Sequence, residues 1–222
     1  MAIAAPRDLK IGKIIDKTLG VVERTAFPAL IFVIVVTALC APISWFTVGS
    51  LSASRLAGGE LLKAVIGIVA AYFLIVPMLR RAGLHTRSDA DAFLPFIGLS
   101  VLSALGVLLG FIAFIIPGLF VMARWSIAQP LLVGQGTGVM ESLGESWERT
   151  RGNEFSIIIA ALALALAPIV VMIATAVFFE ETSPVRIGVT QLASSAMSAI
   201  FLGMGVAIYG LMTGGSEARS FE

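Results

Sequence analysis

The sequence predicts an all-α polytopic membrane protein with about six transmembrane helices and two amphipathic helices at the membrane surface. Of its 222 residues 58% are hydrophobic and 13% are charged, and the mean hydropathy is +1.00. A soluble domain of this length could not bury so much apolar surface. Charge-free stretches cover residues 26–54, 92–123, 155–179 and 187–216. Each exceeds the roughly 20 residues that cross a ~30 Å hydrocarbon core as a helix.

We expect one membrane domain, residues 1–222, in which six apolar segments cross the bilayer. Residues 49–60 are polar and are expected to form a linker before the second span. Lys63 lies close enough to an end of that span to extend its ammonium group outward, and Arg80 and Arg81 close it. The spans are expected at residues 27–46, 61–79, 93–116, 119–133, 155–179 and 187–212.

The third and fourth spans are expected to form a tight hairpin. Proline disfavours helical geometry at Ile116 and glycine permits a turn, so Pro117-Gly118 is the predicted turn. The fourth span is short and contains Pro130, so it is either kinked or re-entrant. A re-entrant segment would reduce the count to five and move the C-terminus to the other side.

Two further segments are amphipathic. In residues 8–24 apolar residues recur near one helical face, and Lys10, Lys13 and Lys17 lie mostly elsewhere. These lysines are predicted to contact anionic lipid headgroups at the membrane surface. Residues 137–151 show the same division of faces. A polar tail is expected at residues 214–222.

The distribution of Lys and Arg predicts the orientation, because loops that stay in the cytoplasm are enriched in them. With both termini inside, Arg55, Lys63 and Arg186 face outward. The inner side then carries Arg7, Lys10, Lys13, Lys17, Arg24, Arg80, Arg81, Arg87, Arg149, Arg151 and Arg219. This asymmetry favours six spans over five, with both ends in the cytoplasm.

The chain contains a candidate internal repeat. Leu19-Gly20 followed by Glu23-Arg24-Thr25 resembles Leu143-Gly144 followed by Glu148-Arg149-Thr150, with one extra residue between the two parts of the second copy. Each copy precedes a long apolar span, which is compatible with parallel repeats. Short matches of this kind also arise by chance.

Arg124 is the candidate functional residue inside a span, because an intramembrane cation is costly and suggests a buried partner or a polar pathway. Measured from the predicted turn, Arg124 lies near the outer interface. Glu180 and Glu181 are therefore the expected partners of a candidate intramembrane ion pair. The depth favours a structural pair or a snorkelling arginine over a ligand or transport role.

The second amphipathic segment carries an acidic face at helical spacing. Glu141, Glu145 and Glu148, with Trp147 as an interfacial anchor, form a candidate partner-docking face. The alternative is an ordinary solvated face.

Catalysis and cofactors are not expected. No histidine or other base accompanies the many serines of the spans. The single cysteine, Cys40, and the single histidine, His85, form no metal or haem site. A net charge of +1 indicates no nucleic-acid partner.

One region resembles the YciC-like family of bacterial inner-membrane proteins, and the related membrane domain beside some glycerophosphoryl diester phosphodiesterases. The residues that carry this resemblance are Ile116-Pro117-Gly118, Arg124, Pro130, Glu141-Ser142, Ser146-Trp147-Glu148 and Thr150-Arg151-Gly152-Asn153. The resemblance implies a six-span protein of the bacterial inner membrane. It does not imply the phosphodiesterase activity, which belongs to a separate soluble domain.

The leading functional hypothesis is a non-catalytic inner-membrane scaffold, an accessory subunit of a membrane complex, or a lipid-interacting module. Its partners would be membrane lipids, with a protein partner or a second copy of the chain also open. The alternative is a small transporter or channel that uses Arg124 and the proline-broken fourth span. An intramembrane enzyme ranks third.

Overall fold

The computed structural model describes residues 9–84 and 92–213, and within these ranges the chain forms nine α-helices. The predicted tail at 214–222 and the single histidine, His85, lie outside the described residues. The helices are α1 (Ile11–Arg24), α2 (Ala26–Thr47), α3 (Ala53–Arg81), α4 (Phe93–Ala113), α5 (Ile115–Arg124), α6 (Ala128–Gln135), α7 (Val139–Arg149), α8 (Glu154–Phe178) and α9 (Pro184–Thr213).

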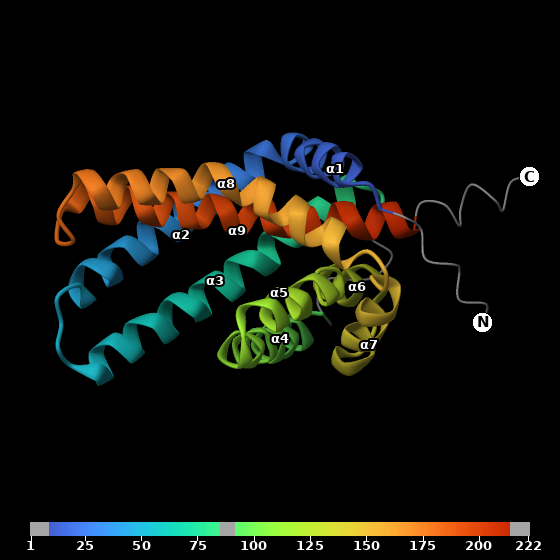
Figure 1. Cartoon of the computed structure of the whole chain (residues 1–222), viewed down its shortest axis with the longest axis horizontal. Coiled ribbons are helices and arrows are strands. Elements are labelled where there is room, and N and C mark those ends of the chain that lie inside the picture. Colours follow the sequence, from blue (N-terminus) through green and yellow to red (C-terminus); the bar gives the residue numbers. More distant parts are fainter. Residues whose placement is uncertain (1–8, 85–91, 214–222) are drawn as a thin grey trace, which may run out of the picture.

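Six helical segments of the described chain are long and apolar enough to span a membrane, namely α2, α3, α4, α5 with α6, α8 and α9. The predicted all-α polytopic class is confirmed. Figure 1 shows two long hairpins, α2–α3 and α8–α9, with the shorter α4–α5 hairpin beside them. The amphipathic helices α1 and α7 both lie toward the end of the bundle at which α9 finishes.

The second span begins earlier than predicted. The polar residues before residue 61 were expected to form a linker, but α3 starts at Ala53 and runs for 29 residues. Nothing in residues 53–60 breaks a helix apart from Gly58 and Gly59, and Gly59 is buried against Thr47 of α2. Hydropathy detects only the part of a helix that meets lipid, so it misses such an extension.

The turn between the third and fourth spans lies at Phe114, which corrects the prediction of Pro117-Gly118. Phe114 is extended, with φ −169° and ψ 161°, and α5 begins at the next residue. Pro117 instead lies in the first turn of α5, where its missing N–H costs nothing. Two glycines permit this abrupt reversal, because a Cβ built on Gly110 would lie 2.9 Å from the Cα of Gly118.

The fourth span contains the predicted kink, a feature compatible with a full crossing and with a re-entrant segment. The helix is interrupted at residues 125–127, between α5 and α6. Pro130 has no N–H to donate, so the carbonyl of Ser126 loses its helical partner. The freed carbonyl lies against α9, where a Cβ built on Gly205 would be 2.7 Å from the Ser126 oxygen.

Helix α9 is the central element of the bundle, since it packs against α1, α2, α3, α6 and α8. It is buried along its second half, from Gly203 to Tyr209. A Cβ built on Gly203 would lie 2.9 Å from the Cγ2 of Val22. Small residues on α9 therefore let α1 lie directly on the bundle, in agreement with the general role of glycine in helix packing.

Candidate functional site

Arg124 is the last residue of α5 and is 7% exposed. Its Nη2 lies 2.6 Å from Oε1 of Glu154, the first residue of α8, and the two side chains are 8% and 10% exposed. Burying either charge alone would be costly, whereas a close pair with further hydrogen bonds offsets much of the loss of water. The two residues join the fourth and fifth spans by an ion pair.

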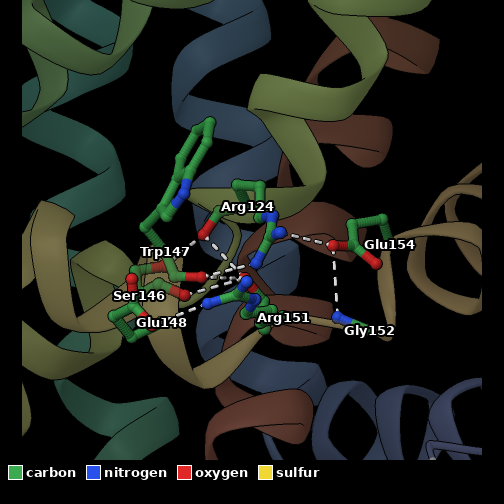
Figure 2. A network of polar contacts seen from close by, with 8 residues as sticks. Arg124, Ser146, Trp147, Glu148, Arg151, Gly152 and Glu154 are labelled. Carbon is green, nitrogen blue, oxygen red and sulfur yellow. Dashed lines mark hydrogen bonds and ion pairs between the residues drawn. The ribbon is translucent and has the colours of Figure 1, made fainter.

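The remaining groups of Arg124 face α7. Its Nη1 donates a hydrogen bond to the carbonyl oxygen of Trp147 at 2.7 Å. Its guanidinium carbon lies 5.1 Å from the ring centroids of both Phe120 and Trp147, a cation–π distance. Figure 2 shows the guanidinium between the α7 backbone and the Glu154 carboxylate.

The backbone of Arg124 is bound by α7 in return. Its carbonyl oxygen accepts hydrogen bonds from Oγ of Ser146 at 2.6 Å and from Oγ1 of Thr150 at 3.1 Å, and both side chains are fully buried. We call Arg124, Ser146, Trp147, Thr150 and Glu154 the Arg124 cluster. Within it the end of α5 and the end of α7 satisfy each other's unpaired backbone groups.

The turn at residues 150–154 aligns this cluster. Gly152 has a φ of +84°, a conformation that glycine adopts without strain. Its N–H donates to Oε1 of Glu154 at 3.1 Å, so the same carboxylate oxygen binds both the turn and Arg124. Oδ1 of Asn153 accepts a hydrogen bond from the backbone N–H of Leu9 at 2.7 Å. The turn thus links α5, α7 and α8 to Leu9, two residues before the start of α1.

The predicted ion pair of Arg124 with Glu180 or Glu181 is wrong. The structure pairs Arg124 with Glu154, while Glu181 lies 3.9 Å from Arg186. The prediction placed Arg124 six residues from an outer turn at Gly118. In the structure the turn is at Phe114, ten residues before Arg124, and α5 ends beside α7 and the start of α8. The carboxylates of the α8–α9 loop lie at the opposite end of α8.

The four residues of the predicted docking face on α7 do not all lie on one exposed surface. Glu145 forms an ion pair with Arg149, and Glu141 accepts a hydrogen bond from the N–H of Gly138 at the start of the helix. Glu148 lies 3.9 Å from Arg151, and both of these side chains are largely exposed. Trp147 does not share this face, because its ring packs on Arg124. The three glutamates alone remain as a candidate surface.

The predicted membrane-surface lysines are exposed. Lys10 precedes α1, and Lys13 and Lys17 are exposed side chains of α1, whose buried residues are Ile14 and Thr18. Their exposure leaves the predicted lipid contact open to test.

The end of α1 shares a feature with the end of α7. Nη1 of Arg81, at the end of α3, donates to the carbonyl oxygen of Arg24 at 2.8 Å. Thr25 and Thr150 each bond back to the carbonyl four residues earlier at 2.7 Å. In both amphipathic helices, a carbonyl oxygen of the last turn therefore accepts a hydrogen bond from an arginine of another helix. This similarity is compatible with the candidate repeat.

Some buried polar atoms near the α5–α6 break lack a hydrogen-bond partner within the described part of the chain. They are Nε of Arg124 and the Oγ atoms of Ser103 and Ser126. Nearby, Nε2 of Gln129 donates to Oγ of Ser100 at 3.3 Å. The break therefore lies in a polar strip between α4 and the fourth span.

Sequence reasoning missed Glu154 because it directly precedes an apolar run and resembles a loop carboxylate. Its position in the chain could have indicated the pair. Glu154 follows the amphipathic helix α7 by a short turn, and a surface helix that folds back against the end of α5 brings the start of α8 close to Arg124. No three His, Cys, Asp or Glu side chains gather into a possible metal site within residues 9–84 and 92–213.

Comparison of the chain with family models, curated proteins and solved structures finds no match. A function for this chain must therefore be inferred from its fold and from the contacts of the Arg124 cluster.

Proposed function

We propose that this integral membrane protein is a non-catalytic scaffold or accessory subunit of the bacterial inner membrane that interacts with lipid. Its working surface is the end of the bundle that carries α1 and α7. The Lys and Arg distribution supports placing this end in the cytoplasm.

The observation that carries this proposal is the engagement of Arg124. Its guanidinium contacts one carboxylate, one backbone carbonyl and two aromatic rings, and its own carbonyl accepts two hydroxyl groups. A residue bound in this way positions α7 against the spans. The buried charge is used to hold a surface helix at a fixed place, which is what a protein that presents a docking surface requires.

The resemblance to YciC-like proteins supports the same proposal. The residues that carry it include Arg124, Ser146, Trp147 and Thr150, which contact one another. The shared pattern therefore describes a structural arrangement, and it supports a common fold without adding a catalytic group.

The proposal is tested by extraction of the protein in native membrane discs, followed by native mass spectrometry. We expect a stoichiometric protein partner or a tightly held lipid, together with an altered complex or envelope in a deletion strain. A bare monomer whose deletion changes neither would overturn the proposal. The α7 surface variant Glu141→Gln/Glu145→Gln/Glu148→Gln separates protein docking from lipid contact.

The alternative function, a small transporter or channel, is favoured by the polar strip at the α5–α6 break. Among the described residues, the buried hydroxyl groups of Ser103 and Ser126 have no hydrogen-bond partner, which is typical of places that admit water or a polar solute. Arg124 itself is bound on several sides, which weakens its part in this alternative.

Reconstituted liposomes decide between the two functions. A transporter requires solute or ion flux that Ser126→Ala or Arg124→Ala reduces, with Ser198→Ala, in an exposed part of α9, as the control. Liposomes that stay tight with folded protein argue for the scaffold.

A further inference from the structure

A cavity of about 290 Å³ lies between α1 and the end of α3. Its lining combines charged and apolar side chains at the level where the amphipathic helix meets the first and second spans. The residues that line it are Asp16, Lys17, Gly20, Val21, Arg24, Thr25, Met78, Arg81 and Ala82. Figure 1 shows α1 at the same end of the bundle as the C-terminal end of α3.

The charge of this cavity is positive. Lys17, Arg24 and Arg81 contribute three cations against the single carboxylate of Asp16. No ion pair involves these three cations within the described residues, and the Arg81 guanidinium donates to the neutral carbonyl of Arg24. Elsewhere in the bundle Lys63, Arg124, Arg149, Arg151 and Arg186 each lie within 4.0 Å of a carboxylate. Among the described residues, the cavity is therefore a place where three cations outnumber one carboxylate and none of the three forms an ion pair.

The geometry of the cavity suits a small anionic group. Arg81 lines the cavity and is oriented by its bond to the Arg24 carbonyl, and its guanidinium has further N–H donors for an anion. A Cβ built on Gly20 would meet nothing within 4 Å, so this wall is open. A volume of about 290 Å³ is close to the lower limit of small-ligand pockets, roughly 300 Å³.

The apolar surroundings favour a lipid over a free anion. Val21, Met78 and Ala82 form apolar parts of the lining. Directly beyond Thr25, helix α2 exposes Phe27 at 72% and Leu30 at 57% to the surroundings of the bundle. A headgroup bound among the cations would thus have its acyl chains beside an exposed apolar helix face.

We propose that the cavity between α1 and α3 binds the phosphate group of an anionic phospholipid through Lys17, Arg24 and Arg81. Basic pockets at the cytoplasmic ends of transmembrane helices recognise anionic headgroups in this way. The inference rests on the lipid interaction in the proposed function and assigns it a site. It also gives α1 a role, because a bound headgroup joins α1 to α3 at the membrane surface.

The test uses the full-length protein in detergent, titrated with phosphatidylglycerol and followed by native mass spectrometry. We expect one tightly bound phosphatidylglycerol. Each charge removed, in Lys17→Gln or Arg24→Gln, should weaken binding about fivefold, and the double variant about thirtyfold. Lys10→Gln/Lys13→Gln removes two charges from the same surface outside the cavity and is the matched control. An equal loss in this control would overturn the site.

Two further binding measurements identify the chemical class of the ligand. Phosphatidylcholine, which carries the same phosphate with a compensating charge, should bind more weakly than phosphatidylglycerol. Glycerol 3-phosphate and inorganic phosphate should not compete at equal concentration, and full competition by either would overturn the lipid assignment.

A final variant keeps the charge. Arg24→Lys retains the cation and the backbone, so it should keep most of the affinity, which separates a headgroup contact from a folding defect. If the double variant folds and holds phosphatidylglycerol like the parent, the site is wrong. The proposed function would still stand if a partner or another lipid is recovered.

Discussion

Arg124 and Glu154 lie 2.6 Å apart at the junction of two spans, and each is almost completely enclosed by protein. The same Glu154 oxygen accepts a hydrogen bond from Gly152, and the arginine also binds the α7 backbone. Both partners of the pair therefore have additional hydrogen bonds, and the energetic contributions of Arg124 and Glu154 depend on each other. Removal of one side chain leaves the charge of the other buried without an opposite charge.

Arg124→Met should therefore destabilise the fold by about 3–5 kcal/mol, since it leaves the Glu154 carboxylate buried and unpaired. The double variant Arg124→Met/Glu154→Met should recover much of this loss, because it removes both charges. Unfolding in mixed micelles of increasing SDS content measures the effect. Arg149→Met, which breaks a partly exposed ion pair on α7, is the control and should cost at most about 1 kcal/mol. A double variant as unstable as the single one would contradict the coupling.

The two hydroxyl groups on the Arg124 carbonyl should act redundantly. Ser146→Ala or Thr150→Val alone leaves one donor on that oxygen, so each should cost about 1 kcal/mol. The combined variant leaves a buried carbonyl with neither hydroxyl, and its cost should exceed the sum of the two. Thr25→Val, at the corresponding end of α1, removes bonds only within its own segment and serves as the comparison. Simple additivity in a double-mutant cycle would argue against this redundancy.

Gly205→Ala should separate α9 from the α5–α6 break. The added Cβ would lie 2.7 Å from the Ser126 oxygen, and such overpacking costs roughly 1–3 kcal/mol. Gly188→Ala on the same helix meets nothing within 4 Å and should be neutral or stabilising by up to about 1 kcal/mol. Thermal unfolding in detergent compares the two. Equal melting temperatures would show that the close approach of α9 is absent.

The proposed orientation, with both termini in the cytoplasm, predicts which residues meet reagents from each side of the membrane. In a Cys40→Ala background, cysteines at exposed Ser52 and Thr182 should react with a membrane-impermeant thiol reagent on intact spheroplasts. Cysteines at Lys13 and Gly144 should react only in inverted vesicles. Reaction of all four from one side would refute the six-span topology.

The spans could be predicted from the sequence because a hydrocarbon core demands a long uncharged run, and each run is visible in the residues. The N-terminal extension of α3 could not, since residues 53–60 lie outside that requirement. The position of the Phe114 turn depends on the contact between Gly110 and Gly118, which only the folded hairpin reveals.

The partner of Arg124 illustrates a second limit. The sequence shows that a buried arginine needs a partner. Which residue is that partner depends on the path of the chain through α6 and α7, and the sequence does not show this path. Because the turn lies at Phe114 and not at Gly118, Arg124 lies farther along its span, beside the start of α8 and away from the α8–α9 loop. The exposed lysines of α1, by contrast, depend only on helical periodicity, and their exposure agrees with it.

The order of synthesis gives the Arg124–Glu154 pair a consequence for biogenesis. Arg124 leaves the ribosome before Glu154 exists, and its span is the least hydrophobic of the six, with a mean hydropathy of 1.3 against 3.0 for α8. The nascent fourth span thus reaches the insertion machinery with an uncompensated cation. We expect the fourth span to stay at the bilayer surface until α8 is synthesised. The two segments would then insert into the membrane together, as a pair.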